Sequence, residues 1–521
     1  MSQATSGNSS SRSIFIASFL TIFAAGVGFA VRAAILNDWA DQFGFTKTDL
    51  GTITGGGLVG FGAVIIISSF FLDQIGYKPI LLLAFVLHLL SAVLTLAATP
   101  VYNAMGQGAT FQCLYWGMFL FSIGNGLCEA AVNPLVATLY PKQKTHYLNI
   151  LHASWPGGLI AGGLMAYCFC GAEPAITKLR WEIPLGMFVV PVLMYGLMIA
   201  TRKLPESEAS KAGVSMGQML AQFASPVLLL LFVIHAMVGY VELGTDSWIT
   251  NIMENVVQDK AILLFIYTSA LMFILRFFAG PIVEHINPLG LLAVSALLGF
   301  IGLMMLSKAE AVGGAFLAAS VYGLGKTFLW PTMLGVVGER FPRGGALVMG
   351  TMGGIGMLSA GLLGGPLIGY KQDYYASENL KSTSSATYER YKAAGENRPV
   401  PFVPAIAGLD GAKVGVLKND GKDLARDYKI VTEAKEKPKS AEEITKLNAW
   451  WTKDAQPNAV IDKPPVEAAG IYGGRKALEL TAYVPATMAG LYLLLVLYFR
   501  ATGGYKQVEI HHQAEGAMSE L

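Results

Sequence analysis

The chain of 521 residues is 53% hydrophobic and only 14% charged, with a formal net charge of +2 and a mean hydropathy of +0.50. A soluble core could not bury that much apolar surface, and the small net charge gives no indication of nucleic-acid binding. Apolar runs of about 20 residues recur along the chain, which is the length that a helix needs to cross a lipid bilayer. The composition predicts an all-α polytopic membrane protein.

Twelve apolar segments are predicted to be transmembrane helices. In chain order they span residues 14–43, 49–72, 80–99, 112–139, 147–171, 181–201, 223–250, 261–283, 289–307, 312–337, 346–370 and 477–500. The first of them is too long for the apolar region of a signal peptide, so we expect it to remain as the first helix.

The two halves of the chain repeat each other. Asp73, after the second predicted helix, corresponds to Glu284 after the eighth, and Pro141 after the fourth corresponds to Pro342 after the tenth. Two six-helix bundles with a binding site between them form a known transporter architecture. The predicted units are an N-terminal bundle (1–201), a cytoplasmic linker (202–222), helices seven to eleven (223–370), an extracytoplasmic insertion (371–476), helix twelve (477–500) and a cytoplasmic tail (501–521).

Basic residues in the short loops predict the orientation of the helices. With the N-terminus inside, the inner side receives Arg12, Lys78, Lys142, Lys144, Arg202, Lys203, Lys211, Arg340, Arg343, Arg500 and Lys506. The short outer loops receive only Lys47, Lys178, Arg180, Lys260 and Lys308. We therefore expect a multi-pass protein of the plasma membrane, a bacterial inner membrane, with both termini in the cytoplasm.

The carboxylate of Glu129 interrupts a long apolar run, and a charged side chain inside a membrane has a high free-energy cost. It lies about ten residues from the inner end of its predicted helix, or roughly 15 Å, near the middle of a hydrocarbon core about 30 Å thick. Burial favours the protonated acid, and proton coupling needs a carboxyl that can be protonated or charged near neutral pH. We predict that Glu129 carries a proton; the alternative is a structural ion pair with Arg32 or another cation.

Polar residues near Glu129 indicate a solute site. Asn125 and Asn133 lie one helical turn on either side of it, on the same face. Asn149 and His152 share a face of the next predicted helix, although a histidine in a span is also commonly an ordinary core residue. These side chains are predicted to bind solute hydroxyl groups.

Trp155 and Trp330 are predicted to stack on a sugar ring, although aromatic residues near membrane spans are also ordinary packing residues or interface anchors.

The first and tenth predicted helices add charged candidates to this site. Asn37 and Asp38 lie toward the outer end of the first helix; Asp38 is predicted to take part in proton coupling and Asn37 in solute binding. Arg32 is deeper and either binds an anionic solute or neutralises Asp38 or Glu129. Lys326 either contacts the solute or is a salt-bridge partner.

A cytoplasmic gate is predicted from the charged residues at or near the inner ends of the second and eighth helices, namely Asp73, Lys78, Arg276 and Glu284. Charge pairs at this level can hold the two halves together in one state and release them in another. A passive loop role is the alternative.

The insertion of residues 371–476 interrupts the repeat, and residues 439–454 within it have the pattern of an exposed amphipathic helix. It is either a passive, partly ordered loop domain or a lid or partner-binding module.

Motifs of other functional classes are absent from the sequence: it contains no G-x4-G-K-[ST] phosphate loop, no paired-histidine zinc motif and no nucleophile elbow. Four cysteines are too few for a disulfide framework, and we interpret them as small apolar helix residues. We expect a monomer without cofactor or metal that is not an enzyme.

The loops after the second and eighth helices and the twelve-helix plan resemble the major facilitator superfamily, over nearly the whole chain outside residues 371–476. Within it, Leu36-Asn37-Asp38, Glu129-x3-Asn133-Pro134 and Leu148-Asn149-x2-His152 resemble the fucose permease branch, the fucose–galactose–glucose:proton symporters. The resemblance implies substrate binding and proton coupling for Asp38 and Glu129. The chain departs from the branch at His152, where glutamine is usual.

Three functions follow as hypotheses. The first is proton-coupled symport of a hexose or deoxyhexose by alternating access, with a small-molecule sugar and a proton as partners. The second is transport of an organic anion, such as a sugar acid, bound by Arg32 and Lys326. The third is a sensor in which residues 371–476 signal solute occupancy.

Overall fold

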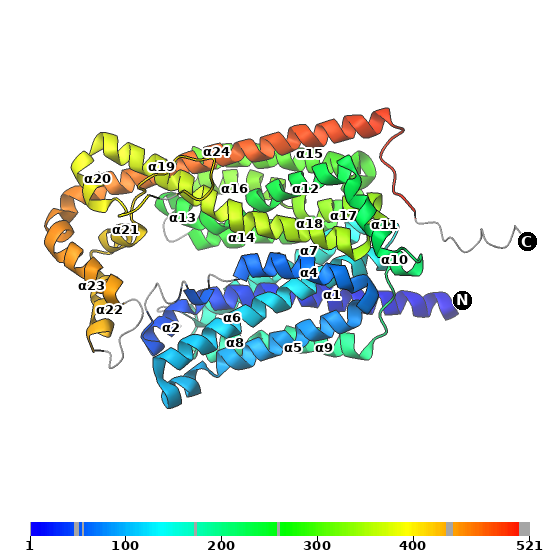
Figure 1. Ribbon diagram of the computed structural model, residues 1–521, viewed down its shortest axis with the longest axis horizontal. Helices are drawn as coiled ribbons and strands as arrows, with labels where there is room; N and C mark the ends of the chain where they lie inside the picture. The colour runs from blue at the N-terminus through cyan, green and yellow to red at the C-terminus, as the bar shows by residue number, and fades with distance from the viewer. Residues whose placement is uncertain are drawn as a thin grey trace, which may run out of the picture.

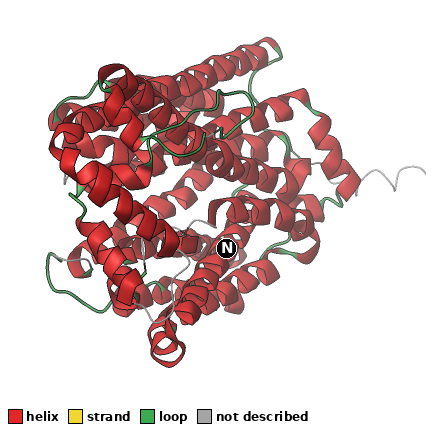
Figure 2. Ribbon diagram, turned by 60° about the vertical axis from the view of Figure 1, so that its left-hand side comes forward, coloured by secondary structure: helices red, strands yellow, loops and turns green. Residues whose placement is uncertain are grey.

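The computed structural model describes residues 2–45, 50, 52–54, 57–170, 174–257, 261–396, 398–433 and 441–509. The described residues are almost entirely helical and contain no β-strand (Figure 2). Ten helices among them are long and apolar enough to cross a membrane. The predicted all-α polytopic class is therefore confirmed.

The first half consists of α1 (Ser2–Ala34), α2 (Leu36–Phe43), α4 (Gly57–Ile75), α5 (Tyr77–Leu96), α6 (Ala98–Leu139), α7 (Lys144–Phe169), α8 (Glu182–Met187) and α9 (Val189–Thr201). The linker holds the short helices α10 (Glu208–Lys211) and α11 (Met216–Ala221). The first predicted span is thus two helices that meet at Ile35, and α6 begins well before the predicted residue 112.

The second half consists of α12 (Pro226–Gly239), the π-helical turn η2 (Tyr240–Gly244), α13 (Thr245–Val257), α14 (Ala261–Leu275), η4 (Arg276–Phe278), α15 (Ala279–Ser307), α16 (Val312–Lys326), α17 (Leu329–Arg340), η5 (Pro342–Gly344), α18 (Gly345–Ser359), the π-helical turn η6 (Ala360–Gly364), α19 (Gly365–Thr383) and α24 (Ala459–Ala501). The predicted eighth span consists of α14, η4 and the first residues of α15, and α15 continues across a kink at Asn287 into the predicted ninth span. One of the ten membrane-length ranges, Leu263–Ser307, combines two predicted spans, and the prediction of twelve helices is compatible with the ten ranges.

Equivalent backbone positions mark the repeat. Gly76, between α4 and α5, has a φ of 86°, and Asn287, at the kink in α15, has a φ of 54°. Each lies three residues after its half's acidic loop residue, Asp73 or Glu284. Glycine and asparagine tolerate positive φ better than other residues, and Pro288 then restarts the helix after the kink. The same sharp turn therefore joins corresponding helices in both halves.

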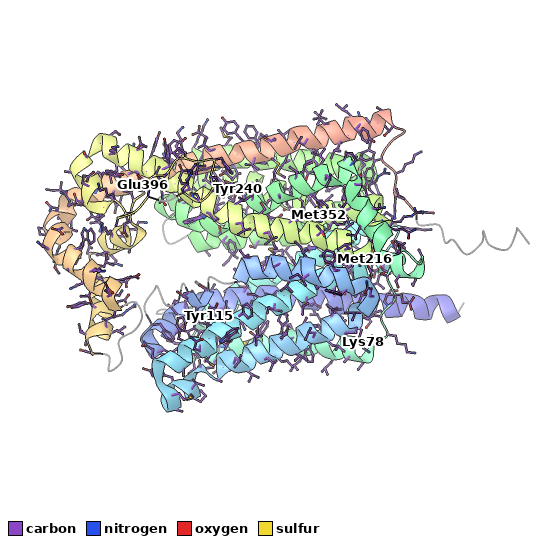
Figure 3. The ribbon with its side chains drawn as sticks, viewed as in Figure 1. Lys78, Tyr115, Met216, Tyr240, Met352 and Glu396 are labelled. Carbon is purple, nitrogen blue, oxygen red and sulfur yellow. The ribbon has the colours of Figure 1, made fainter. Side chains whose placement is uncertain are left out.

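The two halves lie side by side, with α4 packed against α18 and α7 packed against α14 and α17 (Figure 1). The N-terminal end of α1 and the C-terminal end of α24 lie at the same end of the bundle as α10 and α11. Lys78 and Met216 lie toward that end and Glu396 lies at the opposite one (Figure 3). We refer to the end with α10 and α11 as the inner end.

The inserted segment 371–476 is not a separate loop. Its first part continues α19 to Thr383 and its last part opens α24 at Ala459, so both flanking helices extend beyond the bundle (Figure 1). Between them lie α20 (Ser385–Tyr391), α21 (Gly411–Lys418), α22 (Lys422–Glu433), α23 (Ala441–Trp450), η7 (Trp451–Ala455) and η8 (Gln456–Asn458). These helices have a small hydrophobic core of their own, around Leu380, Tyr391 and Trp451. The predicted helix at 439–454 corresponds to α23 and η7, with residues 439 and 440 outside the described part.

Candidate functional site

Glu129 lies in a buried polar cluster formed by α6 and α7. Its Oε1 accepts a hydrogen bond from Asn133 Nδ2 at 3.2 Å. Asn133 Oδ1 lies 2.9 Å from His152 Nε2, which is itself 3.6 Å from Glu129 Oε1. All three residues are buried. Helical spacing places Asn133 one turn from Glu129, and α7 brings His152 onto the same side, so three predicted site residues meet.

The second half closes around this cluster. Asn149 Nδ2 donates to Thr332 Oγ1 of α17 at 3.1 Å, which joins α7 to the other half. Trp330, two residues earlier on α17, is buried and lies beside Glu129. The ring centroids of Trp330 and His235 are 4.7 Å apart. The cluster therefore lies at the interface between the halves, where a transporter of this architecture binds its solute.

Arg276 is not at the cytoplasmic gate, and that prediction is wrong in position. Its guanidinium is buried in the second half and donates to the carbonyls of Thr327 at 2.8 Å and His152 at 2.6 Å. Its third bond goes to Glu242 Oε1 at 3.1 Å. The 3-10 turn of η4 directs the side chain toward the polar cluster rather than toward Glu284. Arg276 is therefore a component of the central site.

Lys326 has a carboxylate partner. Its Nζ donates to both oxygens of Asp246, at 2.6 and 2.7 Å, and its side chain is buried. A buried cation that is neutralised in this way has little capacity to hold an anionic solute. The arrangement favours the alternative that Lys326 is a salt-bridge partner.

Arg32 lies inside the first half, away from both predicted acidic partners. Its guanidinium donates to Ser91 Oγ at 2.8 Å and to the Gly28 carbonyl at 3.2 Å. It also lies over the ring of Phe121, 4.1 Å from the centroid, as in a cation–π contact. These contacts do not join Arg32 to Asp38 or Glu129.

Three further predicted site residues lie outside the Glu129 cluster, and the side chain of a fourth is not among those that the structure describes. Asp38 is 3.3 Å from Lys178 of the loop after α7. Asn125 Oδ1 is 3.0 Å from His88 Nε2 of α5, so it faces into the first half. Trp155 packs against Phe29, with ring centroids 5.9 Å apart. The side chain of Asn37 is outside the described residues.

At the inner end, Asp73 reaches across the interface as the gate prediction requires. Its Oδ2 accepts from the backbone N–H of Ala346 at 2.9 Å, at the N-terminal end of α18, where the helix dipole favours a carboxylate. Lys78 instead donates to the carbonyls of Ala200 and Arg202, at the C-terminal end of α9 in its own half. Glu284 is exposed.

Other contacts at the inner end were not predicted. Glu339 Oε1 accepts from Thr145 Oγ1 at 2.6 Å, and its Oε2 accepts from Tyr505 of the C-terminal tail at 2.7 Å. Lys144 Nζ donates to Glu208 of the linker at 2.6 Å and to the Gly338 carbonyl at 3.0 Å. These bonds join the two halves, the linker and the tail at the inner end. In the sequence, Lys144, Glu208 and Glu339 are indistinguishable from ordinary charged loop residues, and no sequence pattern predicts which residues they bind.

The Lys326–Asp246 pair gives a direct test. Lys326→Met is expected to lower the free energy of unfolding by roughly 3 kcal/mol, because Asp246 would keep a largely buried charge without a partner. The double variant Lys326→Met/Asp246→Leu should recover most of this loss in a thermal-melting measurement. A double variant that is stable but no longer binds solute would show instead that Lys326 contacts the solute.

Two helical halves with a buried polar cluster between them define a membrane transporter. The family model described as Major Facilitator Superfamily matches residues 8–365, and the chain belongs to this superfamily. It is a transporter rather than an enzyme. No curated protein sequence matches the chain.

Solved structures of transporters are similar to this fold. An Escherichia coli fucose:proton symporter has a TM-score of 0.57 and 17% identity, covering 69% of this chain and 92% of its own. A proton:xylose symporter has a TM-score of 0.57 and 16% identity, covering 73% and 90%. A human organic anion transporter has a TM-score of 0.52 and 14% identity, covering 69% and 92%. At these identities the likeness shows the fold alone.

Proposed function

We propose that this protein is a proton-coupled symporter of a neutral sugar, a hexose or deoxyhexose, that works by alternating access. The observation that carries the proposal is the charge balance of the central site. Arg276 and Lys326 are paired with Glu242 and Asp246, two carboxylates one turn apart on the same membrane span. The site therefore offers a solute polar groups rather than a free cation, which suits hydroxyl groups.

Glu129 is the proposed proton carrier. It is buried beside His152 without an arginine or lysine bonded to it among the described residues, so its charged form is costly and its protonated form is accessible. Asp38 remains a second candidate for proton coupling at the outer end of the first half, where Lys178 lies 3.3 Å away. Asn133, Asn149 and His152 are the proposed hydroxyl ligands, and Trp330 is the proposed stacking surface.

The alternative is transport of an organic anion or sugar acid by Arg32 and Lys326. It needs cations that are free to bind an anion, whereas Lys326 is bonded to Asp246 and Arg32 lies against Phe121 in the first half. The sugar proposal is therefore favoured.

We further propose the bacterial inner membrane as the location, with both termini cytoplasmic. The basic-residue count supports this orientation. The N-terminal end of α1 and the C-terminal end of α24 lie at the same end of the bundle, beside the linker helices, as a shared location of both termini requires. A monomer is the proposed functional unit.

Uptake into proteoliposomes tests the function. With an acidic exterior, we expect accumulation of a radiolabelled hexose such as D-galactose, D-glucose or L-fucose, and loss of accumulation when a protonophore dissipates the pH gradient. Accumulation of hexuronates but of none of these neutral sugars would contradict the proposal.

A further inference from the structure

Several buried polar atoms around the central site have no hydrogen-bond partner among the residues that the structure describes. They are Asn149 Oδ1, both ring nitrogens of His235, and Glu242 Oε2. Buried polar groups in proteins are rarely left unpaired, so such atoms indicate a missing partner such as a solute or water. Glu242 is the charged member of this set, and the proposed function uses only its pairing with Arg276, not its second oxygen.

The surroundings of Glu242 fix one oxygen and leave the other free. Oε1 accepts from Arg276, while Oε2 is buried without a hydrogen-bond partner in the described part of the chain. Arg276 also donates to the carbonyls of His152 and Thr327, so each of its three nitrogens makes one hydrogen bond. Glu242 lies in the π-helical turn η2, and single π-helical turns are frequent at functional sites.

Arg276 connects Glu242 to the Glu129 cluster. Its bond to the His152 carbonyl reaches α7 of the first half, and His152 lies 3.6 Å from Glu129 Oε1. Glu242 therefore belongs to the same polar site as Glu129 and lies on the side of it that the second half forms.

We propose that Glu242 determines the specificity of the solute site: its free Oε2 accepts a hydroxyl of a neutral sugar, and its charge cancels that of Arg276 so that anionic sugars are rejected. The inference rests on the proposed sugar transport. A sugar hydroxyl donates a hydrogen bond to Oε2 and leaves the Arg276 pair intact. A solute carboxylate would meet like charge at Oε2, and would have to displace Glu242 to reach Arg276.

Binding of matched ligand pairs tests this. D-galactose and D-galacturonate, and likewise D-glucose and D-glucuronate, differ at C6, where a hydroxymethyl group is replaced by a carboxylate. In the wild type we expect the hexose that is transported to bind at least about tenfold more tightly than its uronate, because like-charge contacts are costly in a buried site. Affinities would be measured by calorimetry or ligand-induced shifts in melting temperature.

Glu242→Gln keeps the shape of the side chain but leaves Arg276 without a counter-charge. We expect its preference for hexose over uronate to fall by at least about tenfold, with tighter uronate binding. Glu242→Asp keeps the charge and should retain the rejection of uronate while binding hexose more weakly. It also keeps the test decisive if Glu242→Gln fails to fold.

Asp462→Asn is the matched control. Asp462 is a fully buried carboxylate that is paired with an arginine, Arg390, but it lies in the inserted segment. The Asp462→Asn variant should prefer hexose over uronate by the same ratio as the wild type. A Glu242→Gln variant that folds and keeps the wild-type ratio, or a Glu242→Asp variant that binds uronate more tightly than the wild type, overturns the inference while leaving sugar transport intact. A wild type that prefers uronates overturns the proposed function itself.

Discussion

Glu129→Gln is expected to abolish proton-driven accumulation of sugar while leaving exchange of sugar across the membrane. Glutamine keeps the hydrogen-bonding shape next to Asn133 and His152 but cannot gain or lose the proton. A proton that moves down a gradient of about one pH unit releases about 1.4 kcal/mol, which supports about tenfold accumulation at one proton per sugar. Uptake into proteoliposomes under such a gradient should therefore fall to simple equilibration.

Counterflow of labelled against unlabelled sugar separates coupling from binding, since it needs no proton gradient. It should persist in Glu129→Gln. Glu442→Gln, on an exposed face of α23, is the matched control and should accumulate sugar normally. Concentrative uptake by Glu129→Gln would mean that another group, such as Asp38, carries the proton.

Gly350→Trp is expected to hold the transporter open at its inner end and to stop transport. Gly350 of α18 lies so close to α4 that even a Cβ at this position would overlap Ser69 Oγ across the interface. Overpacking by single methylene groups costs about 1–3 kcal/mol, and an indole is far larger. Reversing a 99:1 population needs about 5.5 kcal/mol, so closure of the inner path should become the minor state.

Spin-label distances measure this change directly. In a background without the four native cysteines, labels at the exposed positions Thr201 and His285 lie at the inner ends of the two halves. Their separation should increase in Gly350→Trp. Gly163→Trp on α7, where a side chain meets open space, should leave the separation and transport unchanged. An unchanged distance in Gly350→Trp would show that the α4–α18 contact does not control the inner path.

The inner closure rests on close approach as well as on hydrogen bonds. A Cβ at Gly335 of α17 would likewise overlap Thr145 Oγ1 of α7, next to the Glu339 bond. Small residues at both contacts let the halves meet tightly enough to exclude solute. The hydrogen bonds of Asp73, Lys144 and Glu339 then stabilise a geometry that glycine makes possible.

Local spacing explains which site residues were predictable. Glu129 and Asn133 are four residues apart on one helix, and His152 follows after a short turn, so their proximity needs only helical geometry and antiparallel neighbours. Asn125 is also four residues from Glu129, but its side chain points toward His88 of the first half and not toward the Glu129 cluster. Helical spacing predicts which residues share one face of a helix, but it does not predict which neighbouring helix each of them contacts.

Long-range pairing explains the errors. Arg276 was expected beside Glu284, eight residues away, yet its partners are Glu242 and the carbonyl of His152. Similarly, the sequence is compatible with Lys326 as a solute ligand or as an ion-pair partner, and its bond to Asp246 of α13 favours the ion pair. These pairings depend on how each helix is rotated and how far it is shifted along its neighbours, and no local pattern encodes either quantity.

The sequence by itself therefore determined the membrane class, the two repeated halves and the costly carboxylate at Glu129, because hydropathy, repeat spacing and helical periodicity are local properties of the chain. The tertiary structure alone decided that Arg276 and Lys326 are paired with carboxylates, that Glu242 Oε2 has no hydrogen-bond partner among the described residues, and that hydrogen bonds join the two halves at the inner end. Those features arise from contacts between side chains far apart in sequence, and their geometry exists only once the helices have packed.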